Sequence, residues 1–175
     1  ATPYVETDPC NPLSVYGQSK LAGEEAIRAS GCRHLILRTA WVYASRGRNF
    51  LLTMLRLARE RPELRVVDDQ TGSPTWARDI AQATASLLAG RTEAEGIYHL
   101  TATGTTTWCG FAREIVREAG LQTPVHAITT ADYPTPARRP GNSALATDKL
   151  RRDTGVALPE WRESVALCMG ELRGG

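Results

Sequence analysis

The chain has 175 residues, of which 42% are hydrophobic and 23% are charged, a balance typical of a globular protein with a buried core. Its 21 basic and 19 acidic side chains leave a formal net charge of +2, which argues against a protein dedicated to nucleic acid or to a membrane surface. No apolar run approaches the roughly 20 residues that cross a bilayer, and no signal-peptide pattern opens the chain. We expect a soluble protein with no nucleic-acid partner and no membrane association.

The cysteines and histidines are too scattered to form a metal or redox site from neighbouring residues. The four cysteines stand singly, without a C-x-x-C pair, and the three histidines are equally dispersed. Zinc sites and redox motifs need clustered ligands, and disulfide scaffolds need a higher density of cysteine. The sequence therefore predicts a reduced, cytoplasmic protein without a metal site.

The first third of the chain predicts a loop, a long helix and a short strand. Three prolines in the first fifteen residues indicate a loop. Asn11 and Pro12 are typical of a helix start, because asparagine accepts from the first free amides and proline fits the first helical position. We expect a helix over residues 13–30, ended by Gly31. The apolar run over 34–38 then predicts a buried strand.

The rest of the chain alternates between predicted helices and strands. Apolar residues at helical spacing indicate further helices, and short apolar runs bounded by turn residues indicate strands. We expect helices over 49–61, 75–89, 107–119, 148–154 and 160–172, strands over 65–67, 96–100 and 125–128, and a proline-rich loop over 133–142. This alternation predicts an α/β fold with parallel strands. The strands are fewer than the five or six of a typical doubly wound sheet, and no G-x-G-x-x-G sequence follows any of them.

Tyr16 and Lys20 form the most informative pair of the sequence. A separation of four residues on a helix places both side chains on one face, one turn apart. The phenol of tyrosine is a poor acid–base catalyst at neutral pH, and a nearby ammonium group stabilises the phenolate and brings proton transfer into range. Lysine is rare in this chain, where Lys149 is the only other one. The alternative is an ordinary surface pair, because Y-x-x-x-K alone is a weak motif.

Several blocks of sequence resemble the dTDP-4-dehydrorhamnose reductase family of extended short-chain dehydrogenases. The blocks lie at residues 3–6, 11–24, 38–43, 49–50, 69–75, 98–100, 104–108 and 133–143. They follow the family's order over nearly the whole chain, and the Tyr-Pro-Thr-Pro-Ala block points to these reductases rather than to epimerases or dehydratases.

The resemblance implies the fold and its division. The fold would be an incomplete Rossmann-like one, with the catalytic helix and last strands beside a small α/β substrate-binding domain. Residues 1–45 would be the C-terminal part of the Rossmann domain. Residues 46–175 would be mainly the substrate-binding domain, with 76–104 returning to the Rossmann sheet.

The resemblance also implies a reaction, the reduction of the C4 ketone of dTDP-6-deoxy-L-lyxo-4-hexulose to dTDP-L-rhamnose by NADPH or NADH. Tyr16 would donate the proton to the C4 oxygen, and Lys20 would hold the nicotinamide ribose. Trp41 would contact the sugar, and Asn49 would line the substrate pocket. Arg139 would bind the diphosphate, since a guanidinium matches phosphate geometry.

Each of these substrate contacts has a plainer alternative. Trp41 could serve in packing behind its strand, Asn49 could cap a helix, and Arg139 could be one of many solvated arginines. Arg138 is a second diphosphate candidate, but Arg139 directly precedes the Pro-Gly-Asn-Ser run that matches the family. Other aromatic and basic residues are expected to serve in packing or on a solvated helix face: Trp76, Trp108, Trp161, Arg56, Arg59, Arg61 and Arg65.

The family pattern begins with a nucleotide-binding half that carries a glycine-rich phosphate loop and a catalytic Thr or Ser, and neither precedes Ala1. The resemblance therefore implies a C-terminal portion that alone neither binds a nicotinamide tightly nor turns over. It further implies a possible homodimer, with Mg²⁺ at the interface in some members. Two alternatives stay open: a non-catalytic regulatory or binding homologue, and a reductase of a different sugar nucleotide.

Overall fold

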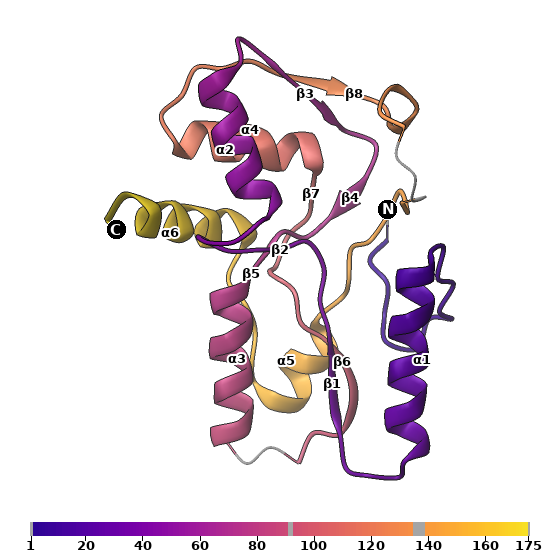
Figure 1. Cartoon of the computed structure of the whole chain (residues 1–175). Helices are drawn as coiled ribbons and strands as arrows, with labels where there is room; N and C mark the ends of the chain where they lie inside the picture. Colours follow the sequence, from indigo (N-terminus) through magenta and orange to yellow (C-terminus); the bar gives the residue numbers. More distant parts are fainter. Residues whose placement is uncertain (1, 91–92, 135–138, 175) are drawn as a thin grey trace.

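The computed structural model describes residues 2–90, 93–134 and 139–174. Its elements alternate as the sequence predicts (Figure 1). In chain order they are α1 (Val15–Ala29), β1 (Leu35–Arg38), β2 (Val42–Tyr43), α2 (Phe50–Glu60), β3 (Leu64–Val67), β4 (Thr71–Gly72), β5 (Thr75–Trp76), α3 (Ala77–Ala89), β6 (Gly96–His99), β7 (Thr106–Thr107), α4 (Trp108–Glu118), β8 (Val125–Ile128), the 3₁₀ turn η1 (Thr130–Asp132), α5 (Asp148–Thr154) and α6 (Trp161–Gly174).

The strands join in pairs. β1 with β6, β2 with β5, and β3 with β8 are parallel, whereas β4 with β7 is antiparallel. The prediction of an α/β fold with parallel strands is thereby confirmed. Parallel partners need a long crossover connection, usually a helix, and α2, α3 and α4 lie in these connections along the chain.

The start of α1 differs from the prediction. The helix begins at Val15 rather than at residue 13, and the capping residue is Ser14 instead of Asn11. The hydroxyl of Ser14 accepts a hydrogen bond from the Gly17 amide at 3.1 Å, which satisfies one of the free amides of the first turn. Pro12 packs beside Gly17, so it lies before the helix and not at its first position.

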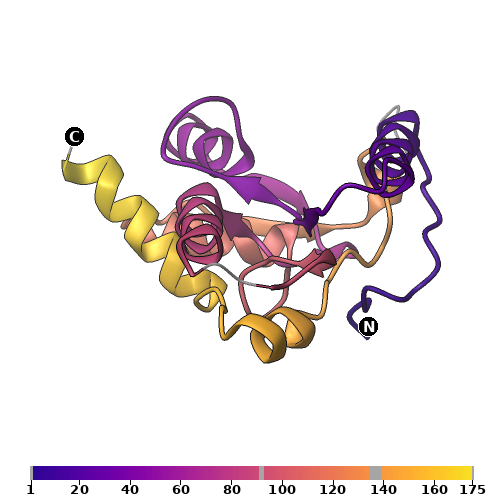
Figure 2. The same cartoon turned by 90° about the horizontal axis from the view of Figure 1, so that it is seen from below.

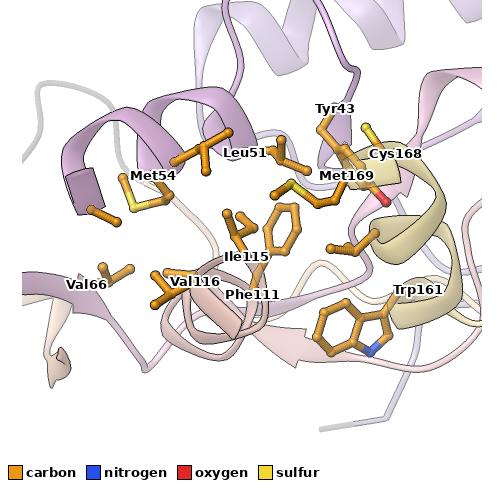
Figure 3. Close-up of a cluster of buried hydrophobic side chains, with 14 of the residues drawn as sticks. Tyr43, Leu51, Met54, Val66, Phe111, Ile115, Val116, Trp161, Cys168 and Met169 are labelled. Carbon is orange, nitrogen blue, oxygen red and sulfur yellow. The ribbon is translucent and has the colours of Figure 1, made fainter. Parts of the chain in front are cut away.

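The buried hydrophobic residues form two separate cores. The larger core joins α2, α4 and α6 with β3, and Figure 3 shows Phe111 at its centre among Leu51, Ile115 and Met169. The smaller core joins α3, α5 and β6: Ala83, Leu87, Tyr98, Leu100, Leu150 and Leu158. Trp76 and Trp161 are buried in the larger core, which confirms the packing role predicted for both.

Helix α1 lies at one edge of the molecule, opposite α6 (Figure 2). None of its residues is buried. Its tie to β1 is a hydrogen-bonded ion pair between Glu24 and Arg38, with a shortest N–O distance of 2.6 Å and side chains that are only 17% and 21% exposed. This pair fixes α1 against β1, so that the first turn of the helix lies beyond the carboxyl end of the strand (Figure 1).

Lys149, which has no role in the sequence analysis, anchors α5 to β6. Its ammonium group donates a hydrogen bond to the carbonyl of Ile97 at 2.7 Å and lies 4.0 Å from the ring centroid of Tyr98. One lysine thereby satisfies a strand carbonyl and makes a cation–π contact. Its place in the chain is structural.

The buried His99 predicts a loss of stability at acidic pH. The side chain is 1% exposed, its Nδ1 lies 3.1 Å from the Ala146 carbonyl oxygen, and its backbone amide donates to Glu6. Burial lowers the pKa of His99; the charge of Arg38 acts in the same direction, and Glu6 opposes it. The unfolded chain takes up this proton near the ordinary pKa of about 6.5, whereas the folded chain takes it up only at lower pH.

The free energy of unfolding is therefore expected to fall as the pH drops below about 6.5. Replacing His99 with Gln should make the free energy of unfolding depend less on pH below about 6.5. Denaturant unfolding followed between about pH 7.5 and 5.5 measures it. The matched control is His126→Gln, which removes an exposed histidine on β8. If the free energy of unfolding changed with pH equally steeply in the parent and in His99→Gln, the prediction would be contradicted.

Candidate functional site

The predicted proton-donor pair lies on the exposed start of α1. Tyr16 is 72% exposed, and the Lys20 ammonium nitrogen is 5.4 Å from the centroid of its ring. In the described part of the chain, neither the phenol oxygen nor the ammonium group has a hydrogen bond or an ion pair. Both groups are free to meet a ligand, and the predicted shared helix face is what the structure shows.

Trp41 adopts an unusual backbone conformation just after β1. Its φ of 50° makes it the only non-glycine residue with positive φ in the described part of the chain. Its indole stacks on that of Trp108, with centroids 3.6 Å apart and planes 7° from parallel. The indole nitrogen donates to the hydroxyl of Ser143 at 2.9 Å. A left-handed backbone costs a bulky residue free energy, so these contacts must hold the conformation.

The acidic start of the loop over residues 68–73 fixes two neighbouring segments. Asp68 accepts a hydrogen bond from the hydroxyl of Thr107, the N-cap of α4. Asp69 accepts from the amide of Thr130 at 2.9 Å and from its hydroxyl at 2.6 Å. The hydrogen bonds from Thr130 lower the pKa of Asp69 below its ordinary value. Both carboxylates are therefore engaged in holding α4 and η1.

The middle of the same loop reaches the aromatic stack. Gln70 accepts from the Trp108 indole nitrogen at 3.2 Å and donates to the Thr130 hydroxyl at 3.0 Å. An indole N–H only donates, so the amide oxygen of Gln70 must face it. Thr71 exchanges backbone hydrogen bonds with Gly141 and Ser143 at 2.8 Å each. The loop thus joins Trp108 to the segment that follows Arg139.

A cavity of about 330 Å³ opens between α2 and β3. Phe50 and Trp108 provide an aromatic wall, and their ring centroids are 4.6 Å apart. Three arginines lie at the cavity together with a tyrosine. The lining residues are Phe50, Thr53, Met54, Leu57, Arg61, Leu64, Arg65, Val66, Val67, Gln70, Trp108, Tyr133 and Arg139. An apolar slot with several guanidinium groups suits a ligand that has a flat ring and phosphate charges.

The predicted substrate residues relate to this cavity in different ways. Arg139, the predicted diphosphate ligand, lines it, whereas Arg138 lies outside the described residues. Trp41 reaches the cavity only through Trp108, and Tyr16 and Lys20 are not among its lining residues.

Asn49 fills the capping role that was its alternative. Its oxygen accepts from the Leu52 amide, and its nitrogen donates to the carbonyls of Ala44 and Arg46. The backbone thus uses both donors of the side chain. Asn49 orients the first turn of α2, from which Phe50 lines the cavity.

Sequence reasoning missed three residues of the cavity. Arg61 and Arg65 are exposed, in agreement with the predicted solvated helix face and its exit, and Trp108 packs on the larger core as predicted, but all three also line the cavity. The sequence gives one usable signal for the arginines: they lie on either side of the Pro62 turn, where the chain passes from α2 to β3. Trp108 carries no such signal, because its partner Trp41 is 67 positions away in the sequence.

The described residues contain no group of three or more His, Cys, Asp or Glu side chains that could hold a metal ion. None of the described helices has the length and apolar composition of a membrane span. Tyr16 and Lys20 have hydrogen-bonding atoms that are free in the described part of the chain and could hold a nicotinamide ribose.

Adding a methyl group at Gly72 is expected to displace the Trp41 indole. A Cβ at this position would lie 2.6 Å from the indole nitrogen of Trp41 and 2.7 Å from the hydroxyl of Ser143. Overpacking of this kind costs about 1–3 kcal/mol of stability. We expect Gly72→Ala to lower the free energy of unfolding by that amount, measured by denaturant titration. Gly141→Ala is the matched control, since its Cβ meets its nearest atom at 3.6 Å; an equal loss in both variants would contradict the explanation.

Comparison with known proteins gives consistent results. The RmlD substrate binding domain family matches residues 1–173. The dTDP-4-dehydrorhamnose reductase of Burkholderia thailandensis is 46% identical over 98% of this chain and 63% of its own length. The same enzyme of Shigella flexneri is 48% identical over 98% of this chain and 60% of its own length. The chain thus spans a little under two thirds of the relatives it matches.

Solved structures agree with the sequence relatives. The dTDP-4-dehydrorhamnose reductase of Clostridium acetobutylicum superimposes with a TM-score of 0.94 at 38% identity, over 99% of this chain and 61% of that one. The Bacillus anthracis enzyme in complex with NADP superimposes with a TM-score of 0.91 at 34% identity, over 97% of this chain and 59% of that one. A Thermus thermophilus UDP-glucose 4-epimerase shares the fold, with a TM-score of 0.79 at 21% identity. The resemblance found in the sequence is confirmed, and the chain belongs to the RmlD substrate binding domain family.

Proposed function

We propose that the protein containing this chain reduces the C4 ketone of dTDP-6-deoxy-L-lyxo-4-hexulose to dTDP-L-rhamnose, with NADPH or NADH as the hydride donor. The observation that carries the proposal is the cavity, which combines an aromatic wall with Arg61, Arg65 and Arg139. A thymine ring fits against Phe50 and Trp108, and a diphosphate suits the guanidinium groups. The relatives named dTDP-4-dehydrorhamnose reductase support it further.

The chemistry divides between a bound nicotinamide and the residues of α1. A nicotinamide, when bound, would supply the hydride for C4. As the C4–O double bond opens, the oxygen gains negative charge, and Tyr16 donates its phenolic proton to that oxygen. The ammonium of Lys20 stabilises the phenolate that is left, since an opposite charge nearby favours the ionised form. Lys20 also has donors for the hydroxyls of the nicotinamide ribose.

The substrate contacts follow from the cavity and the stack. Arg139 would bind the diphosphate, together with Arg61 and Arg65. Trp41 would present its indole to the deoxysugar. Asn49 would support the substrate pocket indirectly, by holding the first turn of α2, because its two amide donors already bond to backbone carbonyls.

A division of the chain completes the proposal. Residues 1–45 and about 76–104 would belong to the nucleotide-binding unit, and the rest mainly to the substrate-binding unit. The parallel pairing of β1 with β6 supports this division, because it brings residues 35–38 and 96–99 into one sheet. A homodimer in the cytoplasm is part of the proposal. Mg²⁺ at the interface between the two copies stays a prediction of the family resemblance.

The decisive experiment uses the natural full-length protein with the dTDP-linked 4-keto sugar. Oxidation of NADPH and of NADH is followed by absorbance, and dTDP-rhamnose is identified by mass spectrometry. Formation of the reduced sugar with either nicotinamide supports the proposal. Equal rates with UDP- or GDP-linked 4-keto sugars would favour the reductase of a different sugar nucleotide.

Binding of the sugar nucleotide without turnover, by calorimetry, would favour the binding homologue. Arg139→Ala tests the diphosphate assignment and is expected to raise KM for the sugar nucleotide. Replacement of an arginine outside the cavity, Arg33→Ala, is the matched control. An unchanged KM in Arg139→Ala would remove Arg139 from the site.

A further inference from the structure

The indole of Trp108 is held on three sides by the described structure. Trp41 covers one face at a centroid distance of 3.6 Å, and Phe50 packs against the ring at 4.6 Å. Gln70 accepts from its indole nitrogen, and Phe111 lies 6.5 Å away in the core. The α4 helix that carries Trp108 begins at this residue and is buried along the face that contains Phe111. Trp108 therefore belongs to the rigid part of the molecule.

Trp41, by contrast, lies outside any helix or strand, although its backbone carbonyl accepts a hydrogen bond from the Thr75 amide at 3.2 Å. It lies between β1 and the two-residue strand β2, and its backbone is left-handed. Its side chain is held by the stack on Trp108, by the Ser143 hydroxyl and by the close approach of Gly72. The nearly parallel stack covers one face of the indole. Removing it leaves a hydrogen bond and an edge contact, which fix the ring plane poorly.

We propose that Trp108 is a positioning residue for Trp41: it sets the plane in which the Trp41 indole meets the sugar, and Gln70 locks Trp108 in turn. The role in sugar binding rests on the proposed function, whereas the role in orienting Trp41 does not. The chain of contacts runs from the 68–73 loop through Gln70 and Trp108 to Trp41. This loop thereby orients the Trp41 indole and, through Thr71, the segment after Arg139.

The first test follows the orientation of Trp41 without any activity. The protein is labelled with 5-fluorotryptophan, and the ¹⁹F resonance of Trp41 is assigned with Trp41→Phe. In Trp108→Phe we expect this resonance to broaden or to split, because the indole samples more than one orientation. Trp76→Phe is the matched control, since it removes an indole outside the stack, and it should leave the Trp41 line as narrow as in the parent. A single narrow line in Trp108→Phe would overturn the proposal.

The second test separates positioning from a direct contact. In the natural full-length protein, Trp108→Phe is expected to raise KM for the sugar nucleotide by about threefold to tenfold, the range that aromatic pairing supplies. KM for the nicotinamide should not change. Gln70→Leu, which keeps the volume but removes the acceptor, should act in the same direction.

A double-mutant cycle shows whether Trp108 acts through Trp41. In a Trp41→Phe background, Trp108→Phe should raise KM by much less than it does in the parent, because the group that it positions is already gone and only its contact with the thymine ring is affected. Fully additive effects would mean that Trp108 acts only through its own contact with the ligand, and they would overturn the proposal. Absence of any reductase activity would refute the proposed function, and the ¹⁹F result would still decide whether Trp108 orients Trp41.

Discussion

Replacing Tyr16 with Phe is expected to lower kcat for ketone reduction by about 100-fold to 10,000-fold, the range that general acid catalysis supplies. Phenylalanine keeps the ring but lacks the proton that the C4 oxygen must receive. Tyr16 is 72% exposed and lies on a helix without buried residues, so folding should not change. KM for the sugar nucleotide should stay within a few-fold of the parent, because no cavity residue is altered.

The control for this experiment is Tyr4→Phe, which removes the hydroxyl of another exposed tyrosine outside the site. It is expected to keep the parent kcat. Both variants should unfold at the same denaturant concentration as the parent. Full activity of Tyr16→Phe would remove the proton-donor role from Tyr16, whereas a loss of activity that parallels a loss of stability would assign the effect to folding.

The site shows which parts of such a structure the sequence can predict. Tyr16 and Lys20 are neighbours by helical periodicity, which is a local property, and the structure places them as expected. The bounds of α5 agree fully with the prediction, and those of α2, α4 and β6 agree within a residue or two, because each has clear apolar spacing and end signals. Local patterns of this kind need no knowledge of the fold.

Other features depend on distant parts of the chain. The strands β2, β4, β5 and β7 have two residues each, too few for an alternating pattern to appear. The sequence predicts that residues 75 and 76 begin a helix, whereas in the structure they pair with β2 as a strand. The stack of Trp41 on Trp108 forms only after folding, so neither residue's surroundings could be inferred from its neighbours.

Asn49 and Lys149 illustrate a further limit. Their side chains have the same chemistry whether they bind a ligand or the chain itself. In Asn49 the backbone takes both amide donors, and in Lys149 a strand carbonyl takes the ammonium. Only the folded structure shows which partner is present. For both residues the partner is the protein.

Removing the ring of Phe111 is expected to cost about 3–5 kcal/mol of stability in Phe111→Ala, the usual range for a buried aromatic residue. Phe111 has no exposed surface and lies within 6.5 Å, centroid to centroid, of four other aromatic rings. Helices α2, α4 and α6 all contribute to the core around it (Figure 3), so the cavity left behind cannot close by the movement of one side chain. Denaturant unfolding with an unchanged m-value measures this loss.

Two further variants distinguish the loss of packing from the loss of any apolar side chain. Leu167→Ala shortens a residue of α6 that is 59% exposed, and we expect a change within about 0.5 kcal/mol. Phe111→Leu keeps most of the volume and should cost less than Phe111→Ala. Because Phe111 packs against Phe50 and Trp108, the Ala variant should also bind dTDP more weakly than Phe111→Leu does, even at temperatures where both are folded. Equal dTDP affinity in these two variants would show that the cavity wall holds its shape without the core beneath it.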